Sequence, residues 1–409
     1  MQEETCMMKI GMLTSGGDCQ ALNAAMRGVV KGLTTNVDEL EIYGFENGYK
    51  GLIYEQYRIL TASDFSGILT RGGTILGSSR QPFKQMRVPD ENGLDKVEAM
   101  KSTYRKLGLD CLVILGGNGT QKTANLLREE GLNIIHLPKT IDNDLALTDH
   151  TPGFGSAAKY IAASTKEVIR DAMGLSYNRK MITIMEIMGR NAGWLTGATA
   201  LAKTEDCCGP DLIYLPEIPF DVDRFLKKCS DLLEKKPSIV IAVSEGIKVP
   251  DGRYVCQLAG GSDYVDAFGH RQLAGTAGYL ASFLAAKTGC KTRAVELSTL
   301  QRSASHMASR VDINEAFMVG GAAVKAADEG DSGRMVVIDR VSDDPYMSAA
   351  GIYDVHKIAN NEKLVPRSWV NREGNYVTRE FIDYVEPLIQ GDYQPFMVNG
   401  LPQHLVLKR

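Results

Sequence analysis

Short runs of apolar residues recur along the chain, and most of them stop at glycines or at polar residues. The sequence holds these runs in KIGMLTSGGD, ELEIYGFENG, DCLVILGGNG, NIIHLPKTIDND, KMITIMEIMGR, DLIYLPEI and SIVIAVSEG. Runs of this length and ending predict buried strands. Apolar residues at helical spacing follow some of them, as in ALNAAMRGVVKGL. The alternation predicts an α/β fold with parallel sheets covered by helices.

This alternation weakens beyond about residue 340. There the stretch VPRSWVNREGNYVTREFIDYVEPLIQG predicts loops and one amphipathic helix. We expect its aromatic residues to serve packing rather than to form a binding platform.

The composition is that of an ordinary globular protein. With 409 residues, 44% apolar and 23% charged, the chain is long enough for two core-bearing domains. Its net charge of −4 gives no reason to expect nucleic acid or an anionic membrane as partner. The acidic N-terminus is unlike a secretory signal, and no apolar run reaches the roughly 18 residues of a membrane span. We therefore expect a cytoplasmic protein.

The eight cysteines form no CxxC pair, and the six histidines are scattered. This pattern favours reduced thiols that act as small apolar residues over a metal site or a disulfide framework.

Two strand ends carry glycine turns that are typical of phosphate sites. They are TSGGD at 14–18 and GGNGT at 116–120. Glycines let the backbone approach a phosphate, and the N-terminus of a following helix adds partial positive charge. In the second turn, Thr120 is expected to cap the helix and to donate to an anion. The second turn fits neither the Walker nor the dinucleotide pattern, and tight turns also need glycine for steric reasons alone.

Acidic residues follow another strand, in PKTIDND at 138–144. Asp142 and Asp144, with Thr140 and Lys139 beside them, suit acid/base chemistry next to a phosphoryl group. One carboxylate can take a hydroxyl proton while the other helps to hold Mg²⁺. Isolated clusters of this kind are also common turn formers.

Several arginines near strand ends offer forked donors that suit phosphate oxygens. They are Arg71, Arg190, Arg293 and Arg302. Each one taken singly is more often a surface residue or an ion-pair partner.

Seven motifs in order make the chain resemble a known family. TSGGD, RGGT with GSSR, GGNGT, TIDND, MEIMGR, SEG and LQR occur in the order and rough spacing of the phosphofructokinase family, from about residue 8 to about residue 330. The segments TDHTPGFGSAAKYIA, MGRNAGWLTGA and PDLIYLPE look most like the branch that includes pyrophosphate-dependent members.

The resemblance implies the phosphofructokinase fold, with two Rossmann-like three-layer α/β/α domains and the active site between them. It implies a phosphoryl-donor-binding domain at 1–153 plus about 301–350, and a sugar-phosphate-binding domain at 154–300. The residues from about 351 to 409 would form a C-terminal extension that packs on the core. It also suggests a homodimer or homotetramer with active sites partly shared between subunits.

The resemblance implies roles for individual residues. Asp142 matches the catalytic base that deprotonates the sugar 1-hydroxyl, and Thr140 matches the hydroxyl of the same loop. The positions that match the metal site are Asn118 and Asp144. Those that match donor-binding residues are Gly16, Arg71, Gly119, Thr120 and Lys139. Those that match sugar-phosphate ligands are Met188, Gly189, Arg190, Glu245, Arg293, which commonly reaches across a subunit interface, and Arg302.

Three positions depart from the family pattern. Asn118 stands where many members have an aspartate that helps to bind Mg²⁺, so its lost charge lowers metal affinity or shifts the load to Asp144. Thr299 occupies the place of a familiar His or Tyr in the sugar site, and Met181 that of a phosphate-binding arginine.

The implied activity is that of a 6-phosphofructokinase, which transfers a phosphoryl group to the 1-hydroxyl of fructose 6-phosphate with Mg²⁺ and yields fructose 1,6-bisphosphate in glycolysis. Gly119 leaves room for the α-phosphate of ATP, whereas the overall resemblance favours a reversible, pyrophosphate-dependent enzyme. We expect ATP as the donor by a small margin.

Asn118 and Thr299 suggest a non-catalytic regulatory subunit as an alternative, and the presence of both aspartates argues against it. A kinase of sedoheptulose 7-phosphate would use the same chemistry.

Overall fold

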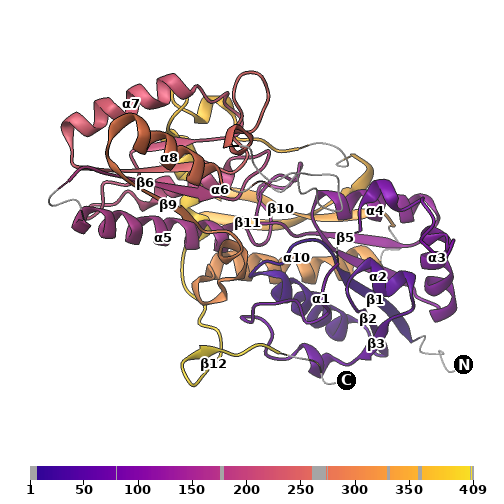
Figure 1. Ribbon diagram of the computed structural model, residues 1–409. Coiled ribbons are helices and arrows are strands. Elements are labelled where there is room, and N and C mark those ends of the chain that lie inside the picture. The colour runs from indigo at the N-terminus through magenta and orange to yellow at the C-terminus, as the bar shows by residue number, and fades with distance from the viewer. Residues whose placement is uncertain are drawn as a thin grey trace, which may run out of the picture. The chain divides into compact units, whose positions relative to one another are not determined.

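The chain folds into two compact units, each with its own mainly parallel sheet (Figure 1). Unit 1 comprises Met1–Ser156, Arg302–Glu362 and Gly391–Arg409, and unit 2 comprises Ala157–Gln301 and Lys363–Gln390. The structure is a computed structural model that describes residues 7–79, 81–175, 179–259, 273, 275–328, 332–357, 362–405 and 407.

Unit 1 is built on a seven-stranded sheet in the order β11-β10-β5-β4-β1-β2-β3. The strands are β1 Met8–Thr14, β2 Leu40–Phe45, β3 Tyr57–Leu60, β4 Cys111–Gly116, β5 Ile134–Pro138, β10 Arg334–Asp343 and β11 Tyr346–Asp354. Neighbouring strands from β10 to β2 run parallel, while β3 and β11 pair antiparallel at the two edges. A separate small hairpin joins β12 Met397–Val398 to β13 Leu401–Pro402.

The helices of unit 1 pack on this sheet. They are α1 Leu22–Asn36, α2 Tyr49–Ile53, α3 Lys96–Leu107, α4 Asn118–Glu129 and α10 Arg310–Asp328. Helices α1 and α10 lie side by side because glycines let their backbones meet (Figure 1). A Cβ built on Gly28 would lie 2.1 Å from the carbonyl oxygen of Phe317, and one on Gly320 would lie 2.0 Å from that of Ala25.

Unit 2 is built on a four-stranded parallel sheet in the order β7-β8-β6-β9. The strands are β6 Met181–Ile187, β7 Leu212–Tyr214, β8 Ser238–Ser244 and β9 Lys291–Glu296. The helices are α5 Phe154–Leu175, which begins in unit 1, α6 Trp194–Gly197, α7 Val222–Lys235, α8 Thr276–Thr288 and α11 Arg379–Val385, with α9 Leu300–Ser303 at the unit boundary. Short 3-10 helices of the two units lie at Ala62–Phe65, Phe83–Gln85, Ala198–Ala202, Val255–Ala259, Ser305–Met307, Val355–Lys357, Arg367–Trp369 and Glu386–Ile389.

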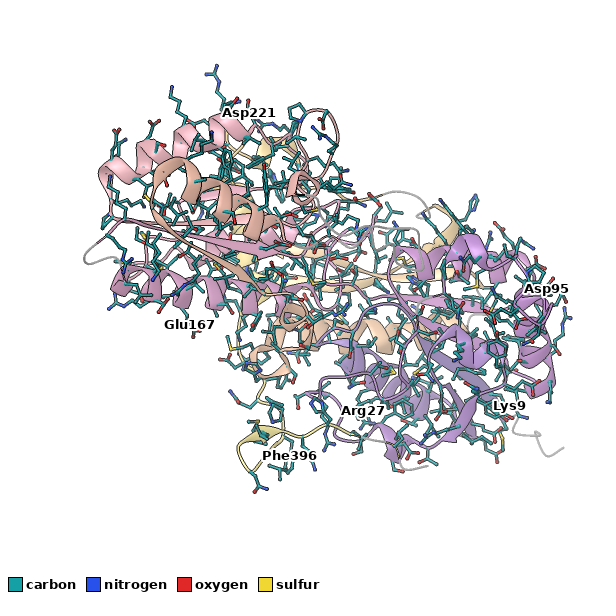
Figure 2. The ribbon with its side chains drawn as sticks, viewed as in Figure 1. Lys9, Arg27, Asp95, Glu167, Asp221 and Phe396 are labelled. Carbon is teal, nitrogen blue, oxygen red and sulfur yellow. The ribbon has the colours of Figure 1, made fainter. Side chains whose placement is uncertain are left out.

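Capping aspartates fix where two of the surface helices begin (Figure 2). Asp95 precedes α3 and accepts hydrogen bonds from the amides of Val97 and Glu98 at 2.9 and 3.1 Å. Asp221 does the same for α7, accepting from Asp223 and Arg224 at 3.0 and 2.9 Å. Each carboxylate satisfies orphan donors of the first turn and complements the helix dipole.

Both sheets bring strand ends together at a point where the chain changes direction. In unit 1 the chain leaves β1 toward β2 and β3, then returns to the other side of β1 through β4. Thr14 lies opposite Leu115, which lies opposite Leu137, so the loops after β1, β4 and β5 start at one level. In unit 2, β6 lies between β8 and β9 in the same way. Ligands of doubly wound sheets bind outside such carboxyl ends.

The α/β prediction is confirmed, and each apolar run named in the sequence forms a strand. The antiparallel hairpin of β10 and β11 was not predicted, because β11 lies at an edge and its YMSAAGIYD mixes small, polar and aromatic residues.

One α-helix, α11, lies in the C-terminal stretch where one was predicted. The residues of the expected C-terminal extension, about 351–409, belong to both units, since 351–362 and 391–409 are in unit 1 and 363–390 in unit 2. The binding roles assigned to the two units stay predictions.

In the described part of the chain, none of the helices has the length and apolar character that crossing a bilayer requires.

Candidate functional site

The turn after β1 is surrounded by cationic side chains. A Cβ built on Gly16, whose φ is +87°, would lie 3.5 Å from Nζ of Lys139. One built on Gly17 would lie 2.8 Å from Nη1 of Arg302, and Lys139 Nζ donates to the carbonyl oxygen of Gly17. Burial lowers the pKa of Lys139, an effect that Cys19, Asp18 and Asp142 oppose. Two cations therefore lie against a glycine turn whose backbone can approach an anion.

The segment 71–79 is held against this turn by hydrogen bonds. Asp18 accepts from the amide of Thr74 at 3.2 Å, and Ser78 Oγ donates to the carbonyl oxygen of Gly16 at 2.6 Å. Burial raises the pKa of Asp18 although Cys19, Lys139 and Thr74 favour its ionised form. The predicted motifs TSGGD and RGGT thus form one structure.

Arg71 lies in this segment, and its side chain meets the C-terminal residues of unit 1. Its Nη2 donates to Oε1 of Gln403 at 3.4 Å, and His404 Nδ1 lies 3.0 Å from the carbonyl oxygen of Gly72. Nε of Arg71 is buried and has no hydrogen-bond partner among the described residues. The Nε–H group of Arg71 is therefore available to donate a hydrogen bond to a ligand beside the glycine turn.

The turn after β4 leads into α4, which begins at Asn118. Oδ1 of Asn118 is buried and unpartnered within the described residues, whereas Gly119 is exposed and a Cβ on it would meet no heavy atom within 4 Å. The expectation that Thr120 caps the helix is wrong, because Gly117 is the N-cap residue and makes no side-chain cap. Thr120 lies inside the first turn, and its side chain is buried against Gly116.

The loop after β5 carries the two predicted aspartates. Thr140 Oγ1 donates to Oδ2 of Asp142 at 3.2 Å and accepts from the amide of Asp142 at 3.1 Å. Asn143, which stands between the two aspartates, has φ +54° and so adopts the left-handed conformation. Burial raises the pKa of Asp144, and the charges of Asp142 and Glu362 raise it further. These carboxylates repel one another, and a cation between them would remove that cost.

The loop also touches the turn after β4. The amide of Lys139 donates to the carbonyl oxygen of Gly116 at 3.1 Å, and a Cβ built on Gly117 would lie 3.7 Å from Cβ of Thr140. One edge of unit 1 therefore gathers both glycine turns, the Asp142 loop, Lys139 and Arg302.

This edge offers oxygen ligands that would fit Mg²⁺. No group of three or more His, Cys, Asp or Glu side chains with metal-site geometry occurs in the described part of the chain. Mg²⁺, however, needs only one or two carboxylates, since waters and substrate phosphates complete its shell. Asn118, whose buried Oδ1 has no hydrogen-bond partner among the described residues, and Asp144 are the residues here that could hold it.

In unit 2 the turn after β6 meets the turn after β8. Gly189 has φ +147°, its carbonyl oxygen accepts from Ser244 Oγ, and its amide lies 3.5 Å from Oε1 of Glu245. A Cβ on Gly246 would lie 2.0 Å from the carbonyl oxygen of Arg190, so only glycine allows this approach. The amide of Met188 donates to Gln301 Oε1 at 3.1 Å. The predicted residues 188–190 and Glu245 thus lie together.

Two predicted sugar-phosphate ligands lie elsewhere in the fold. Arg293 is in the middle of β9, opposite Thr183, and its Nη1 lies 2.6 Å from Oδ2 of Asp171. Arg302 belongs to unit 1 and lies against Gly17. The predicted set is therefore divided, and the role of each residue stays a prediction.

Comparison with known proteins assigns the chain to a family. The family model described as Phosphofructokinase matches residues 9–327. The chain belongs to the phosphofructokinase family. This membership confirms the predicted family and the predicted phosphotransferase.

Relatives within the phosphofructokinase family differ in the donor that their names give. The pyrophosphate–fructose 6-phosphate 1-phosphotransferase of Halomonas elongata is 34% identical over 399 residues, 95% of this chain and 93% of that protein. The ATP-dependent 6-phosphofructokinase of Spirochaeta thermophila is 40% identical over 338 residues, 80% of this chain and 86% of that protein. The solved pyrophosphate-dependent phosphofructokinase of Nitrosospira multiformis is 30% identical, covers 98% of this chain and 96% of its own, and has a TM-score of 0.86.

Two carboxylates beside the unit 2 turn, those of the buried Glu186 and the half-buried Glu217, were not predicted as site residues. Glu186 lies next to the end of β6, and its Oε2 accepts from the amide of Ala277 at 2.8 Å. Burial raises the pKa of Glu186 to about 7. Glu217 follows β7, and burial raises its pKa as well. Glu186 within the apolar MEIMGR was a visible signal, whereas nothing in PDLIYLPE singled out Glu217.

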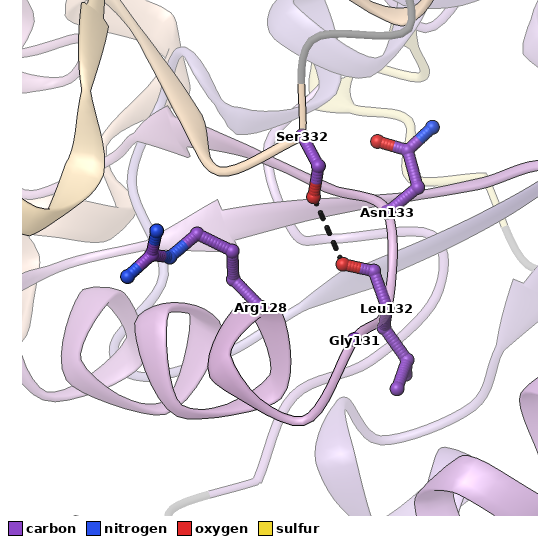
Figure 3. A pocket seen from close by; sticks show the side chains of 5 residues that line it. All are labelled: Arg128, Gly131, Leu132, Asn133 and Ser332. Carbon is purple, nitrogen blue, oxygen red and sulfur yellow. Dashed lines mark hydrogen bonds between the residues drawn. The ribbon is translucent and has the colours of Figure 1, made fainter.

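A pocket of about 350 Å³ lies away from the predicted site residues (Figure 3). It is lined by Arg128, Gly131, Leu132, Asn133 and Ser332. Ser332 Oγ donates to the carbonyl oxygen of Leu132 at 2.9 Å, as the dashed line shows. These residues precede β5 and β10 or end α4, so the pocket is at the amino ends of the strands. None of the predicted site residues lines it.

Proposed function

We propose that the protein transfers a phosphoryl group to the 1-hydroxyl of fructose 6-phosphate and yields fructose 1,6-bisphosphate, as a step of glycolysis in the cytoplasm. The observation that carries this proposal is the edge of unit 1 where the Asp142 loop adjoins two glycine turns and two cations. The names of the relatives supply the sugar phosphate, since both act on fructose 6-phosphate or carry the name 6-phosphofructokinase.

In this proposal Asp142 is the general base. An alcohol is a weak nucleophile, so a carboxylate that accepts its proton in the transition state speeds the attack. Thr140 fixes that carboxylate by a hydrogen bond at 3.2 Å. The backbone of Gly16 and Gly17, together with Lys139 and Arg302, would stabilise charge on the transferring group. The contact of Arg302 with Gly17 favours this role over sugar-phosphate binding.

Asn118 and Asp144 would hold Mg²⁺, which neutralises charge on the donor phosphates when it is bound. The remaining proposed donor contacts are Arg71, Gly119 and Thr120. Residues 188–190, Glu245 and Arg293 of unit 2 are the proposed ligands of fructose 6-phosphate. We include a homodimer or homotetramer in the proposal, which light scattering of the purified protein checks.

The donor is a choice between ATP and pyrophosphate. Open space around Gly119 supports ATP, because a nucleotide brings an additional phosphate to this turn. The relative that spans 95% of the chain is named for pyrophosphate, and this supports the second candidate. We propose ATP, with the pyrophosphate-dependent enzyme as the alternative.

The test uses purified protein, fructose 6-phosphate and Mg²⁺ with either donor, in both reaction directions. Turnover with pyrophosphate and none with ATP would reverse the donor proposal. Asp142→Ala should stay folded, with an unfolding temperature no lower than that of the wild type, and lose at least about 100-fold in kcat. A wild type that binds fructose 6-phosphate without turnover would instead identify a regulatory subunit. Sedoheptulose 7-phosphate in a parallel reaction tests the sugar.

A further inference from the structure

The C-terminal segment 363–390 packs on the residues that follow the unit 2 turn, and it lies beyond the stretch that the family model matches. Trp194 Nε1 donates to the carbonyl oxygen of Lys363 at 2.8 Å. The Trp194 ring contacts Trp369, Phe381 and Tyr384, with ring centroids 6.0, 5.9 and 5.3 Å away. Trp194 itself is fully buried by these contacts.

Two further contacts fix this segment on unit 2. A Cβ built on Gly197 would lie 2.4 Å from Cζ of Phe381, so the phenyl ring lies directly on the α6 backbone. The amide of Ile213 in the edge strand β7 donates to the carbonyl oxygen of Asn375 at 2.9 Å. The segment therefore covers both the edge of the sheet and the helix after the turn.

One carboxylate joins this segment to the turn. Oε1 of Glu217 accepts from the amide of Gly193 at 2.8 Å and from the amide of Val365 at 3.0 Å. Its Oε2 is buried, has no hydrogen-bond partner in the part of the chain described, and would lie 2.7 Å from a Cβ on Gly193. Burying carboxylate oxygens costs free energy unless hydrogen bonds compensate for the lost water, so the two backbone amides are what hold this side chain here.

The position of Gly193 in turn affects the proposed sugar-phosphate ligands. A Cβ built on Gly189 would lie 2.6 Å from the carbonyl oxygen of Ala192, so the backbone before Gly193 supports the Gly189 conformation directly. Gly189 also has a positive φ, a conformation that the surroundings must hold in place.

We propose that Glu217 is a positioning residue that holds residues 188–193 in the conformation required for the sugar phosphate, with segment 363–390 as its outer support. The inference rests on the proposed binding of fructose 6-phosphate at residues 188–190. Glu217 acts through backbone amides, so a neutral side chain with the same acceptor should serve as well as the carboxylate.

The experiment compares Glu217→Leu, Glu217→Gln and the control Glu373→Gln. Glu373 lies on the same segment, is exposed, and pairs with Lys228 at 2.7 Å away from the turn. Glu217→Leu removes both hydrogen bonds and should raise KM for fructose 6-phosphate about tenfold, with KM for the donor changed less than about twofold. Glu217→Gln and Glu373→Gln should stay within about twofold of the wild type in both constants.

Tryptophan fluorescence controls for folding, since Trp194 and Trp369 are the two tryptophans of the chain. Their emission should be unchanged in Glu217→Gln. If Glu217→Leu does not fold, Trp194→Phe replaces it, because this change keeps a ring but removes the donor to Lys363. It should raise KM for fructose 6-phosphate selectively, by about threefold.

The outcomes separate the two proposals. A wild type without turnover defeats the proposed function, and calorimetric binding of fructose 6-phosphate to the same variants then tests the positioning role alone. An unchanged affinity in both Glu217→Leu and Trp194→Phe, equal impairment in Glu217→Gln and Glu217→Leu, or an equal rise in the KM of the donor overturns the inference. Absence of any fructose 6-phosphate binding overturns it too.

Discussion

Gly119 is the residue whose substitution best tests whether ATP or pyrophosphate is the phosphoryl donor. It is the second residue of α4, it is exposed, and a Cβ on it would meet nothing within 4 Å. Alanine and aspartate are both tolerated in the first turn of a helix, and aspartate also complements the helix dipole. Substitutions here therefore test ligand binding without a cost in folding.

We predict that Gly119→Asp lowers the ratio of kcat/KM for ATP to kcat/KM for pyrophosphate by at least about tenfold. The new carboxylate would repel the additional phosphate that ATP brings and that pyrophosphate lacks. Gly119→Ala adds volume without charge and should change the ratio less than about threefold. An equal loss with both donors in Gly119→Asp would contradict the steric and electrostatic account.

Asp144 gives a prediction of pH dependence. Its pKa in the folded protein is raised above the ordinary 3.8 by burial, Asp142 and Glu362. The stability that its neutral form contributes is present below the unfolded pKa and is lost as the pH rises through the folded pKa. Without metal, Asp144→Asn should therefore raise the unfolding temperature more at about pH 8 than at about pH 4. Thermal scans in a chelator test this, and a difference that does not change with pH would refute it.

The sequence predicted which site residues lie near each other only where those residues directly follow a strand. TSGGD, GGNGT, TIDND and MGR follow strands, so their gathering at the carboxyl ends of the two sheets was predictable from the sequence. The direction of a side chain was not. Arg293 pairs with Asp171 on α5 and Arg302 lies on Gly17, each through a tertiary contact that no local pattern records.

At the scale of elements, a buried charged cluster joins the loop before α5 to three elements of unit 1. His150 Nδ1 lies 2.8 Å from Oδ2 of Asp149, and its Nε2 lies 2.7 Å from Oε2 of Glu315 on α10. Tyr346 and Ser348 of β11 each donate to Oε1 of Glu315 at 2.6 Å. Arg340 of β10 pairs with Asp149 at 3.1 Å. The cluster thus ties α10 to the β10–β11 hairpin.

This cluster predicts how stability depends on pH. Burial lowers the pKa of His150, but Glu315 and Asp149 outweigh it and raise the pKa to about 9. The stability that the charged His150 imidazolium adds to the folded protein is fully present below the pKa of His150 in the unfolded chain. It is lost as the pH rises through about 9. His150→Asn should cost about 3 kcal/mol near pH 7, because it leaves Glu315 buried without its cation, and less near pH 10. Urea unfolding at both values measures this. A cost that is the same at both would show that His150 is neutral in the folded protein.

The strands of this fold were predictable because burial on both faces makes them continuous apolar runs. Strand β4, CLVILG, is buried throughout and ends at glycine. The hairpin of β10 and β11 follows no such rule. Residues of β11 are half-buried or exposed, and the strand is stabilised by pairing with β10 and by the contacts to Glu315. Pairing of this kind depends on partners distant in sequence.

At the scale of the whole molecule, the proposed ligands divide between the two units. Unit 1 holds the proposed donor contacts and the base, in residues 14–18, 117–120 and 139–144. Unit 2 holds residues 188–193 and Glu245. Most of these residues lie in loops after strands or in the first turn of α4, so a bound ligand should slow the hydrogen exchange of their amides.

We therefore predict two separate protection patterns in hydrogen exchange measured by mass spectrometry on Asp142→Ala, which prevents turnover. Donor with Mg²⁺ should slow exchange in 14–18, 117–120 and 139–144, because these loops lose their local opening when they hold the phosphates. Fructose 6-phosphate alone should slow exchange in 188–193 and around Glu245. Exchange in β2 and α3 should be unchanged by either ligand, which controls for global stabilisation. Protection of 188–193 by the donor alone, or of 14–18 by the sugar phosphate alone, would show that the residues were assigned to the wrong substrate.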